Sequence, residues 1–164
     1  MIDLNHLERY RENNRLEAKR AVGGLPQSLW ETYSAFANTQ GGVILLGVEE
    51  HRDKSLHPVD LPDAPGILQD FWEIINDRDK VSANILTDRD VRQVDLNGRQ
   101  IIVINVPRAP VEVLPIYLGN QPDIGTFWRS GEGDFRCSPR EVLNMAMGLG
   151  EPKRPASSSA DRER

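Results

Sequence analysis

The stretch SAFANTQGGVILLGVEE, residues 34–50, decides the fold because it joins the end of a helix to a buried strand. Upstream, apolar residues recur at helical spacing, which predicts a helix over about 26–39 with Pro26 in its first turn. Gly41-Gly42 is a typical helix stop. The apolar run 43–48 that follows predicts a central strand buried on both faces.

The sequence after this strand predicts a second helix and a hairpin. Residues 51–65 are typical of a loop, and apolar residues at helical spacing predict a helix at about 66–76. Residues 82–96 are predicted to be extended. Asn97-Gly98 is the strongest hairpin signal in the chain, because a type I′ turn needs positive φ at both central positions. A second strand over 99–106 completes the hairpin.

The last part of the chain predicts an irregular connection, a strand and a capped helix. Four prolines interrupt residues 107–123, and residues 124–129 are predicted to form a last strand. Residues 138–141 are Ser-Pro-Arg-Glu, which combine a serine N-cap, a proline at the first helical position and a glutamate able to reach back. This signature predicts a final helix at about 139–147.

The N-terminal segment is shorter and less regular. Residues 4–11 predict a short helix with Asn5 as its N-cap, followed by a turn. Residues 16–19 are ambiguous; if they form a strand, Glu17 and Lys19 share one of its faces. Strands therefore alternate irregularly with helices. This order predicts an α+β fold, a mixed and mostly antiparallel sheet with helices packed on it.

Composition is that of an ordinary soluble protein. The chain has 164 residues, of which 38% are hydrophobic and 27% charged, and it lacks an apolar run of the roughly 20 residues that a membrane helix needs. Its start does not resemble a signal peptide, and the single cysteine, Cys137, excludes an internal disulfide. We expect a cytoplasmic domain over 1–149 and a disordered polar tail over 150–164.

The charge balance bears directly on nucleic-acid binding. A formal net charge of −5 argues against binding through the whole surface. Residues 9–20 nevertheless contain five basic side chains against two glutamates. That segment is either a local basic patch or an ordinary solvated segment.

Glu12, Glu17 and Lys19 are the first candidates for chemistry. Carboxylates hold Mg²⁺ or Mn²⁺, and a lysine beside them can neutralise a phosphate or a developing negative charge. Metal-assisted phosphodiester cleavage uses this mixture. The ordinary interpretation is a charged surface, since such residues occur together on many proteins.

Residues 38–42, Asn-Thr-Gln-Gly-Gly, offer a second candidate. Exposed N–H groups beside Gly41 and Gly42 would bind a phosphate. A helix C-cap is the better interpretation, because the dipole at a helix C-terminus repels an anion. The chain contains neither G-x-x-x-x-G-K-[ST] nor G-x-G-x-x-G, so the sequence does not support a conventional nucleotide site.

The remaining candidates are an acidic pair and an arginine beside aromatic residues. Glu49-Glu50 follows the predicted central strand and is either functional or a surface acidic patch. Arg129 lies next to Phe127 and Trp128, where it would clamp a phosphate while a ring stacks on a base. On a strand these two rings face opposite ways, so one of them is expected in the core. The three histidines show no ligand or triad spacing, and we interpret Cys137 as structural.

The order of these segments resembles the Schlafen/Alba-like domain family. That family has an E-x-x-x-x-E-[F]-K element, a SAFANT-x-GG helix end, a GV-[DE]-[DE] strand end, an I-I-x-I-x-V-P strand and a [YF]-x-R-x-G segment. The matching residues are 12–19, 34–42, 47–50, 101–107 and 127–131, followed by Ser138 and Glu141 before the last helix. The resemblance spans about residues 8–147, and SAFANT-x-GG is its most specific part. Ala18 replaces the usual phenylalanine.

The resemblance implies nucleic-acid binding. Family members look like DNA- or RNA-binding modules of transcriptional regulators, and an older assignment describes them as ATP-binding. Some eukaryotic members are metal-dependent ribonucleases that use two glutamates and a downstream acid. Glu12 and Glu17 match the first two, and Glu50 is our choice for the third, with Glu49 and Asp53 as alternatives.

We therefore expect a nucleic-acid-binding regulatory module, with partner DNA or RNA and a homodimer as a possible assembly. The alternatives are a Mg²⁺- or Mn²⁺-dependent endoribonuclease that uses Glu12, Glu17, Glu50 and Lys19, and an ATP-binding or protein-assembly module. Nucleic-acid binding itself calls for no certain cofactor, whereas the ribonuclease would use Mg²⁺ or Mn²⁺. The expected nucleic-acid-binding residues are Arg15, Lys19, Arg20, Asn38, Gly41, Gly42, Arg129 and Gly131.

Overall fold

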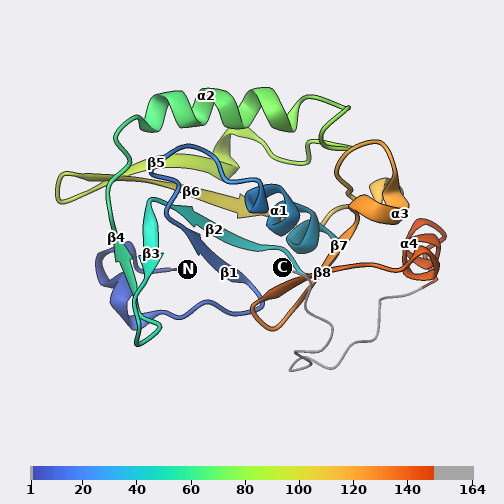
Figure 1. Cartoon of the computed structure of the whole chain (residues 1–164), viewed down its shortest axis with the longest axis horizontal. Helices are drawn as coiled ribbons and strands as arrows, with labels where there is room; N and C mark the ends of the chain where they lie inside the picture. The colour runs from blue at the N-terminus through green and yellow to red at the C-terminus, as the bar shows by residue number, and fades with distance from the viewer. Residues whose placement is uncertain (1, 150–164) are drawn as a thin grey trace.

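A four-stranded sheet forms the centre of the computed structural model, which describes residues 2–149 (Figure 1). Its strand order is β1-β2-β6-β5. The strands are β1 (Leu16–Lys19), β2 (Gly42–Leu46), β6 (Arg99–Val106) and β5 (Val91–Leu96). β1 and β2 are parallel, whereas the β2–β6 and β6–β5 pairs are antiparallel. The predicted α+β fold with a mixed, mostly antiparallel sheet is confirmed.

Two helices cover one face of this sheet and make the larger core. They are α1 (Ser28–Asn38), which connects the parallel strands β1 and β2, and α2 (Ala64–Ile75). Their apolar sides pack on alternate residues of β2 and β6, where Ile44, Ile102 and Ile104 are fully or almost fully buried. Trp30 of α1 stacks on Phe71 of α2 with ring centroids 5.2 Å apart. Both predicted helices are present, although Pro26 lies just before the N-cap of α1.

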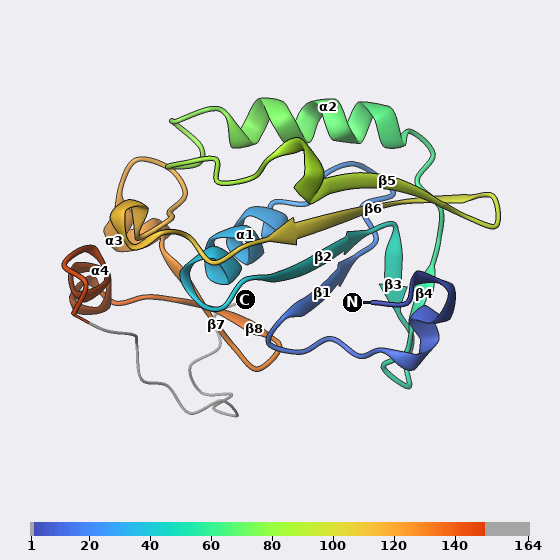
Figure 2. The same ribbon diagram turned by 180° about the vertical axis from the view of Figure 1, so that it is seen from behind.

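The other face of the sheet is covered at one end only, as the view from behind shows (Figure 2). The cover consists of the 3-10 segment η1 (Leu4–Arg9) and the two-stranded β3 (Val48–Glu50) and β4 (Leu56–Pro58). Leu7, Val48 and Leu56 pack there against the buried side chains of the sheet. The cap of η1 is Asp3, whose side chain accepts from the backbone of Asn5, so the prediction of Asn5 as N-cap is wrong.

Gly47 divides the apolar run that was predicted as one strand over 43–48. Its φ of +83° turns the chain out of β2 and into β3. Its N–H donates to the carbonyl of Lys19 at 2.9 Å, and a Cβ there would lie 2.8 Å from Leu61 Cγ. An apolar pattern does not report such a bend. The segment predicted as a loop over 51–65 contains the short strand β4, which pairs with β3.

A second hairpin, β7 (Phe127–Ser130) and β8 (Gly133–Arg136), packs on α1 rather than joining the main sheet. The strand predicted from residue 124 begins later, because residues 122–125 form the short helix α3 (Pro122–Gly125). Phe127 and Trp128 are both buried, although only one was expected in the core. The reason is that the hairpin lies between α1 and α4 (Pro139–Ala146), so that both of its faces are covered.

The strongest local signals are confirmed. Asn97 and Gly98 have φ of +55° and +88° between β5 and β6. The final helix has a reciprocal capping box between Ser138 and Glu141. Residues 82–90, predicted as extended, are mostly irregular. The remaining short elements are η2 (Asp88–Asp90) and η3 (Val111–Val113).

No helix among residues 2–149 combines the length and the apolar character needed to cross a membrane. The predicted tail over 150–164 lies outside the described residues.

Candidate functional site

Three carboxylates converge beyond the free edge of β1. One oxygen each from Glu12, Glu50 and Glu132 lies within 4.8 Å of the others, and this is the one such acidic group among residues 2–149. Glu12 precedes β1, Glu50 ends β3, and Glu132 occupies the turn between β7 and β8. Segments far apart in the sequence therefore build the site. We call these three residues the carboxylate cluster.

Glu12 is the best-anchored member of the cluster. Its Oε2 accepts a hydrogen bond from the backbone N–H of Ala18 at 3.0 Å, which fixes it on the edge of β1. Burial, followed by repulsion from Glu17 and the smaller repulsion from Glu50, raises the pKa of Glu12 to about 7. A cation in the cluster would favour the ionised form of this carboxyl.

Glu17 is a close neighbour of Glu12 but is not one of the three clustered carboxylates, and two cations hold it. Its Oε1 lies 2.9 Å from Arg129 Nη2, and its Oε2 lies 3.4 Å from Lys19 Nζ. Lys19 also donates to Ser28 Oγ of α1 at 3.1 Å. The prediction that Glu17 and Lys19 share one face of a strand is confirmed. The expected ligand set of Glu12, Glu17 and Glu50 differs from the observed group, in which Glu132 stands beside Glu12 and Glu50.

Arg129 does not reach the surface. Its side chain is 0% exposed, and its guanidinium pairs with Glu17 at 2.9 Å and with Asp134 at 2.7 Å. It also donates to the carbonyl of Asn13 at 2.8 Å and lies 4.9 Å from the ring centroid of Phe36. These contacts leave no room for a phosphate, so the expected phosphate clamp does not fit this structure. The sequence shows an arginine beside rings but not which of its neighbours are buried.

The SAFANT part of the motif attaches β7 to α1. Asn38 is buried, and its amide donates to the carbonyls of Ile116 and Phe127, both at 2.9 Å, and accepts from the N–H of Ile116 at 2.8 Å. Thr39 Oγ1 accepts from the N–H of Arg129 at 3.0 Å. Ser34 Oγ accepts from the N–H of Phe127 at 3.1 Å. These polar side chains thus bond to backbone groups of β7, as a neighbouring strand would. Because they are already bonded, they are not available to a phosphate.

The two glycines of the motif are needed for packing. A Cβ at Gly41, whose φ is +76°, would lie 2.6 Å from the carbonyl oxygen of Val106. A Cβ at Gly42 would lie 2.8 Å from the ring of Phe36. Both glycines are buried, so the helix-end interpretation explains them and phosphate binding does not. Gly131 has φ of +58° in the β7–β8 turn, where it positions the adjacent Glu132.

The expected basic residues Arg15 and Arg20 are exposed. Arg20 Nε lies 3.2 Å from Glu49 Oε1, an ion pair on the surface. The guanidinium of Arg15 has no hydrogen-bond or ion-pair partner among residues 2–149. Of the expected nucleic-acid-binding residues, these two are the ones that offer a charge to solvent.

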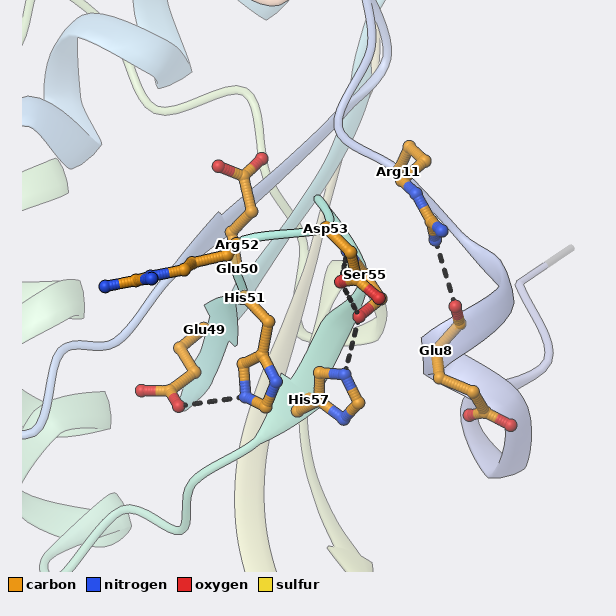
Figure 3. A pocket seen from close by; sticks show the side chains of 9 residues that line it. All are labelled: Glu8, Arg11, Glu49, Glu50, His51, Arg52, Asp53, Ser55 and His57. Carbon is orange, nitrogen blue, oxygen red and sulfur yellow. Dashed lines mark hydrogen bonds and ion pairs between the residues drawn. The ribbon is translucent and has the colours of Figure 1, made fainter.

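A hollow of about 880 Å³ adjoins the carboxylate cluster through Glu50 (Figure 3). Its wall contains two histidines that sequence spacing did not bring together. His51 and His57 stack with ring centroids 3.7 Å apart, because the β3–β4 pairing brings their segments together. Figure 3 shows how each is held, His51 by Glu49 at 3.1 Å and His57 by Ser55 Oγ at 2.7 Å. Glu49 is thereby engaged with His51 and Arg20.

The alternatives considered for the third acid differ clearly in their surroundings. Asp53 accepts from the N–H of Ser55 at 2.9 Å and from its hydroxyl, and these hydrogen bonds lower the pKa of Asp53. Glu50 has an exposed partner, Lys54, at 3.7 Å. Glu132 was missed because its position depends on how the β7–β8 hairpin packs. The sequence signal that could have identified Glu132 is its position directly after Arg129-Ser130-Gly131 of the family motif.

The cluster suits a hard divalent cation. Mg²⁺ and Mn²⁺ prefer carboxylate oxygens at about 2.0–2.2 Å, so oxygens separated by up to about twice that distance can share one ion. The three clustered carboxylates have oxygens within 4.8 Å of one another, close to that separation, whereas Glu17 is paired with Arg129 and Lys19. Glu12, Glu50 and Glu132 are therefore the residues that would hold such an ion.

Comparison with known proteins agrees with the fold. The model of the family "Schlafen, AlbA_2" matches residues 12–138. The solution NMR structure of the N-terminal domain of the "Putative ATP-dependent DNA Helicase RecG-related Protein" from Nitrosomonas europaea is similar, with 26% identity and a TM-score of 0.52 over 75% of this chain and 81% of that one. The crystal structure of the DIP2311 protein from Corynebacterium diphtheriae has 19% identity and a TM-score of 0.42, over 75% of this chain and 21% of that chain. No curated protein matches the sequence.

Proposed function

Because the chain belongs to the Schlafen AlbA_2 family, we propose that it is a nucleic-acid-binding module. The N-terminal domain of a RecG-related protein, named as a DNA helicase, has the same fold, which supports a role on DNA or RNA. The observation that carries the proposal is local charge. Arg11, Arg15 and Arg20 are exposed around β1, in a chain whose formal net charge is −5.

These three arginines contact phosphates in our proposal, whereas Lys19 and Arg129 act indirectly. The latter two hold Glu17 at 3.4 and 2.9 Å and so fix the strand beside which the exposed arginines lie. Asn38, Gly41 and Gly42 likewise support the fold. A phosphate-contacting surface of this size predicts binding that weakens steeply as salt concentration rises.

The test is the salt dependence of binding to labelled single-stranded and duplex oligonucleotides. In the triple variant R11Q/R15Q/R20Q, the slope of log K against log salt should fall by about 2 for a single strand, at about 0.7 per lost phosphate contact. The variant K80Q/R99Q/R140Q removes the same charge from exposed positions elsewhere and serves as the matched control. Equal losses in both variants would show that only net charge matters, and the proposed surface would be rejected.

Metal-dependent RNA cleavage is the second candidate, favoured by the carboxylate cluster alone. Glu12, Glu50 and Glu132 would hold Mg²⁺ or Mn²⁺, which supplies Lewis acidity and a bound water of lowered pKa. The pKa of about 7 that Glu12 has without a metal ion is raised by burial and by neighbouring carboxylates, and a bound cation would favour its ionised, metal-ligating form. Lys19 is paired with Glu17, so its expected contact with transition-state charge requires that this ion pair open.

Cleavage is tested with purified protein, labelled tRNA-like and single-stranded RNA, and Mn²⁺ or EDTA. Loss of cleavage is expected in E12Q, E50Q and E132Q, and E49Q is the control because Glu49 is engaged with Arg20 and His51. Cleavage that persists in all three variants would come from another enzyme. Intact RNA that still shifts in a gel would leave the binding function without the nuclease.

A further inference from the structure

A groove crosses the open end of the sheet, on the face opposite α1 and α2. It consists of two adjoining hollows of about 490 and 530 Å³. The hollows share four lining residues, Ile2, Tyr10, Val43 and Asn105, and are therefore continuous. The groove is separate from the carboxylate cluster, which lies beyond the edge of β1.

The groove exists because the cover of this sheet face is incomplete. η1 and the β3–β4 pair bury the end of the sheet that contains Leu45 and Ile101. At the other end, the partly buried Val43 of β2 stands opposite the exposed Asn105 of β6 in the antiparallel register, and both line the groove. The floor is thus apolar with one amide group in it.

Two arginines stand at the sides of this groove. Arg15 precedes β1 and Arg92 lies on β5, and both are exposed. Within residues 2–149 neither guanidinium has a hydrogen-bond or ion-pair partner. Asp90 is the acidic residue in the lining, and its Oδ2 already accepts from Thr87 N at 2.8 Å and Thr87 Oγ1 at 3.1 Å.

Tyr10 lines both hollows of the groove and provides an aromatic surface there. Its hydroxyl accepts from the N–H of Asp3 at 2.8 Å, which restrains the ring, and the residue is only half-buried. Asn105 is exposed, and its side-chain amide makes no hydrogen bond within the described chain, so it can both donate and accept. A flat ring, an apolar floor, a free amide and two free cations together match an unpaired base attached to phosphates.

We propose that this groove binds an extended single strand of nucleic acid, with a base on Tyr10 and phosphates at Arg15 and Arg92. The inference rests on the proposed nucleic-acid-binding function and adds its substrate class. β1 and β5 are three strand spacings apart, about 14 Å in total. The arginines are thus placed for different phosphates of one strand. Duplex is disfavoured because its paired bases cannot stack on a side chain in the groove.

The test compares wild type with Y10L and R92Q in binding to fluorescently labelled single-stranded RNA and DNA and to duplexes of the same sequence. Y10L keeps an apolar side chain but removes the ring, and should weaken single-strand binding about tenfold. R92Q should lower the salt slope for single strands by about 0.7. Neither change should alter duplex binding, and R99Q, on the same hairpin, is the control.

Each outcome decides between the claims. R92Q changes an exposed side chain and should leave the fold intact. For Y10L, thermal melting shows whether the variant is folded. If both variants bind single strands like wild type while R11Q/R20Q binds weakly, the groove is wrong and the proposed function stands. If the wild type binds no nucleic acid, both are wrong. If Y10L and R92Q lose only the binding of an extended acidic peptide, the groove takes a protein segment and the proposal is overturned.

Discussion

Two groups of acids flank β1 and differ in what neutralises them. Glu17 and Asp134 are each 14% exposed, and both contact the buried Arg129. The carboxylate cluster has a single exposed lysine, Lys54, 3.7 Å from Glu50 as its ion-pair partner in the described chain. The first group carries its own counter-charge, whereas the second remains in excess of negative charge and is suited to an external cation.

The pKa of Glu12 reflects this difference. Burial and the neighbouring carboxylates raise it to about 7, which is the response of an acid group that lacks a cation. Family resemblance assigns Glu12 and Glu17 to one set of ligands, but their partners separate them. Acidic residues with the same motif signature thus have different roles when one of them contacts a buried arginine.

The largest effect should come from removing Arg129. R129M leaves the partly buried Asp134 without its cation and Glu17 with Lys19 alone, and breaking a buried ion pair from one side costs about 3–5 kcal/mol. For a chain of this size that should lower the Tm by about 10 °C. Urea and thermal unfolding measure it, with exposed R99Q expected within about 0.5 kcal/mol of wild type. A small loss would show that the ion pairs of the buried Arg129 add little to stability.

Asn38 should have the next largest effect, because it attaches the strand that carries Arg129 to α1. N38A leaves the N–H of Ile116 and the carbonyls of Ile116 and Phe127 without their amide partner. We expect a loss of about 3 kcal/mol in urea unfolding, since buried unsatisfied groups cost about 1–3 kcal/mol each and some can relax. Q40A is the control, because Gln40 lies two residues further along the chain and is exposed. Its free energy of unfolding should be close to that of wild type. Equal stability of N38A and Q40A would contradict the attachment.

Mn²⁺ tests the carboxylate cluster directly. At pH 8 and a free concentration of about one hundred times Kd, the ion should stabilise wild type by about 2.7 kcal/mol. The increase in Tm should disappear in E132Q and E50Q but persist in E49Q, because Glu49 is already paired with Arg20. If E49Q removed the increase and E132Q did not, the ion would be bound elsewhere in the adjacent hollow.

The smallest effect is the pH dependence that Glu12 contributes. Its folded pKa of about 7 lies above the ordinary value of 4.5, so the folded state keeps a proton that the unfolded state loses. The contribution of Glu12 to stability therefore falls as pH rises from about 4.5 to about 7 and is level above that. E12Q removes this fall and should be about 1–2 kcal/mol more stable than wild type at pH 8, after screening by solvent. Metal-free unfolding at pH 5 and pH 8 measures it; a parallel shift at both values would exclude the titration.

Local sequence signals predicted much of the fold. Asn97-Gly98 and Ser138-Pro139 act within a few residues, and the hairpin and the capped helix are where these signals place them. The run 43–48 was predicted as one strand because hydrophobicity does not encode φ, and Gly47 divides it. The structural features that depend only on residues close in the sequence were therefore the easiest to predict.

The candidate site was less accessible, because its members come from three separate hairpins and loops. Glu12 and Glu50 were selected from family resemblance, and the structure places them together. Glu132 required knowledge of how β7–β8 packs on α1. Arg129 has a side chain suited to phosphate in any sequence, and its burial against the partners Glu17 and Asp134 reveals a structural role.

The division of Glu49 and Glu50 between different partners has an evolutionary consequence. β3 pairs with β4 through Glu49 opposite His57 and Glu50 opposite Leu56, and consecutive strand residues point to opposite sides. An insertion or deletion of one residue between Gly47 and Glu49 would exchange the two acids without changing the composition of the segment. Relatives that retain an acidic pair here but differ in the length of this connection would then present the other glutamate to the cluster, so the length of the segment carries as much information as the residues themselves.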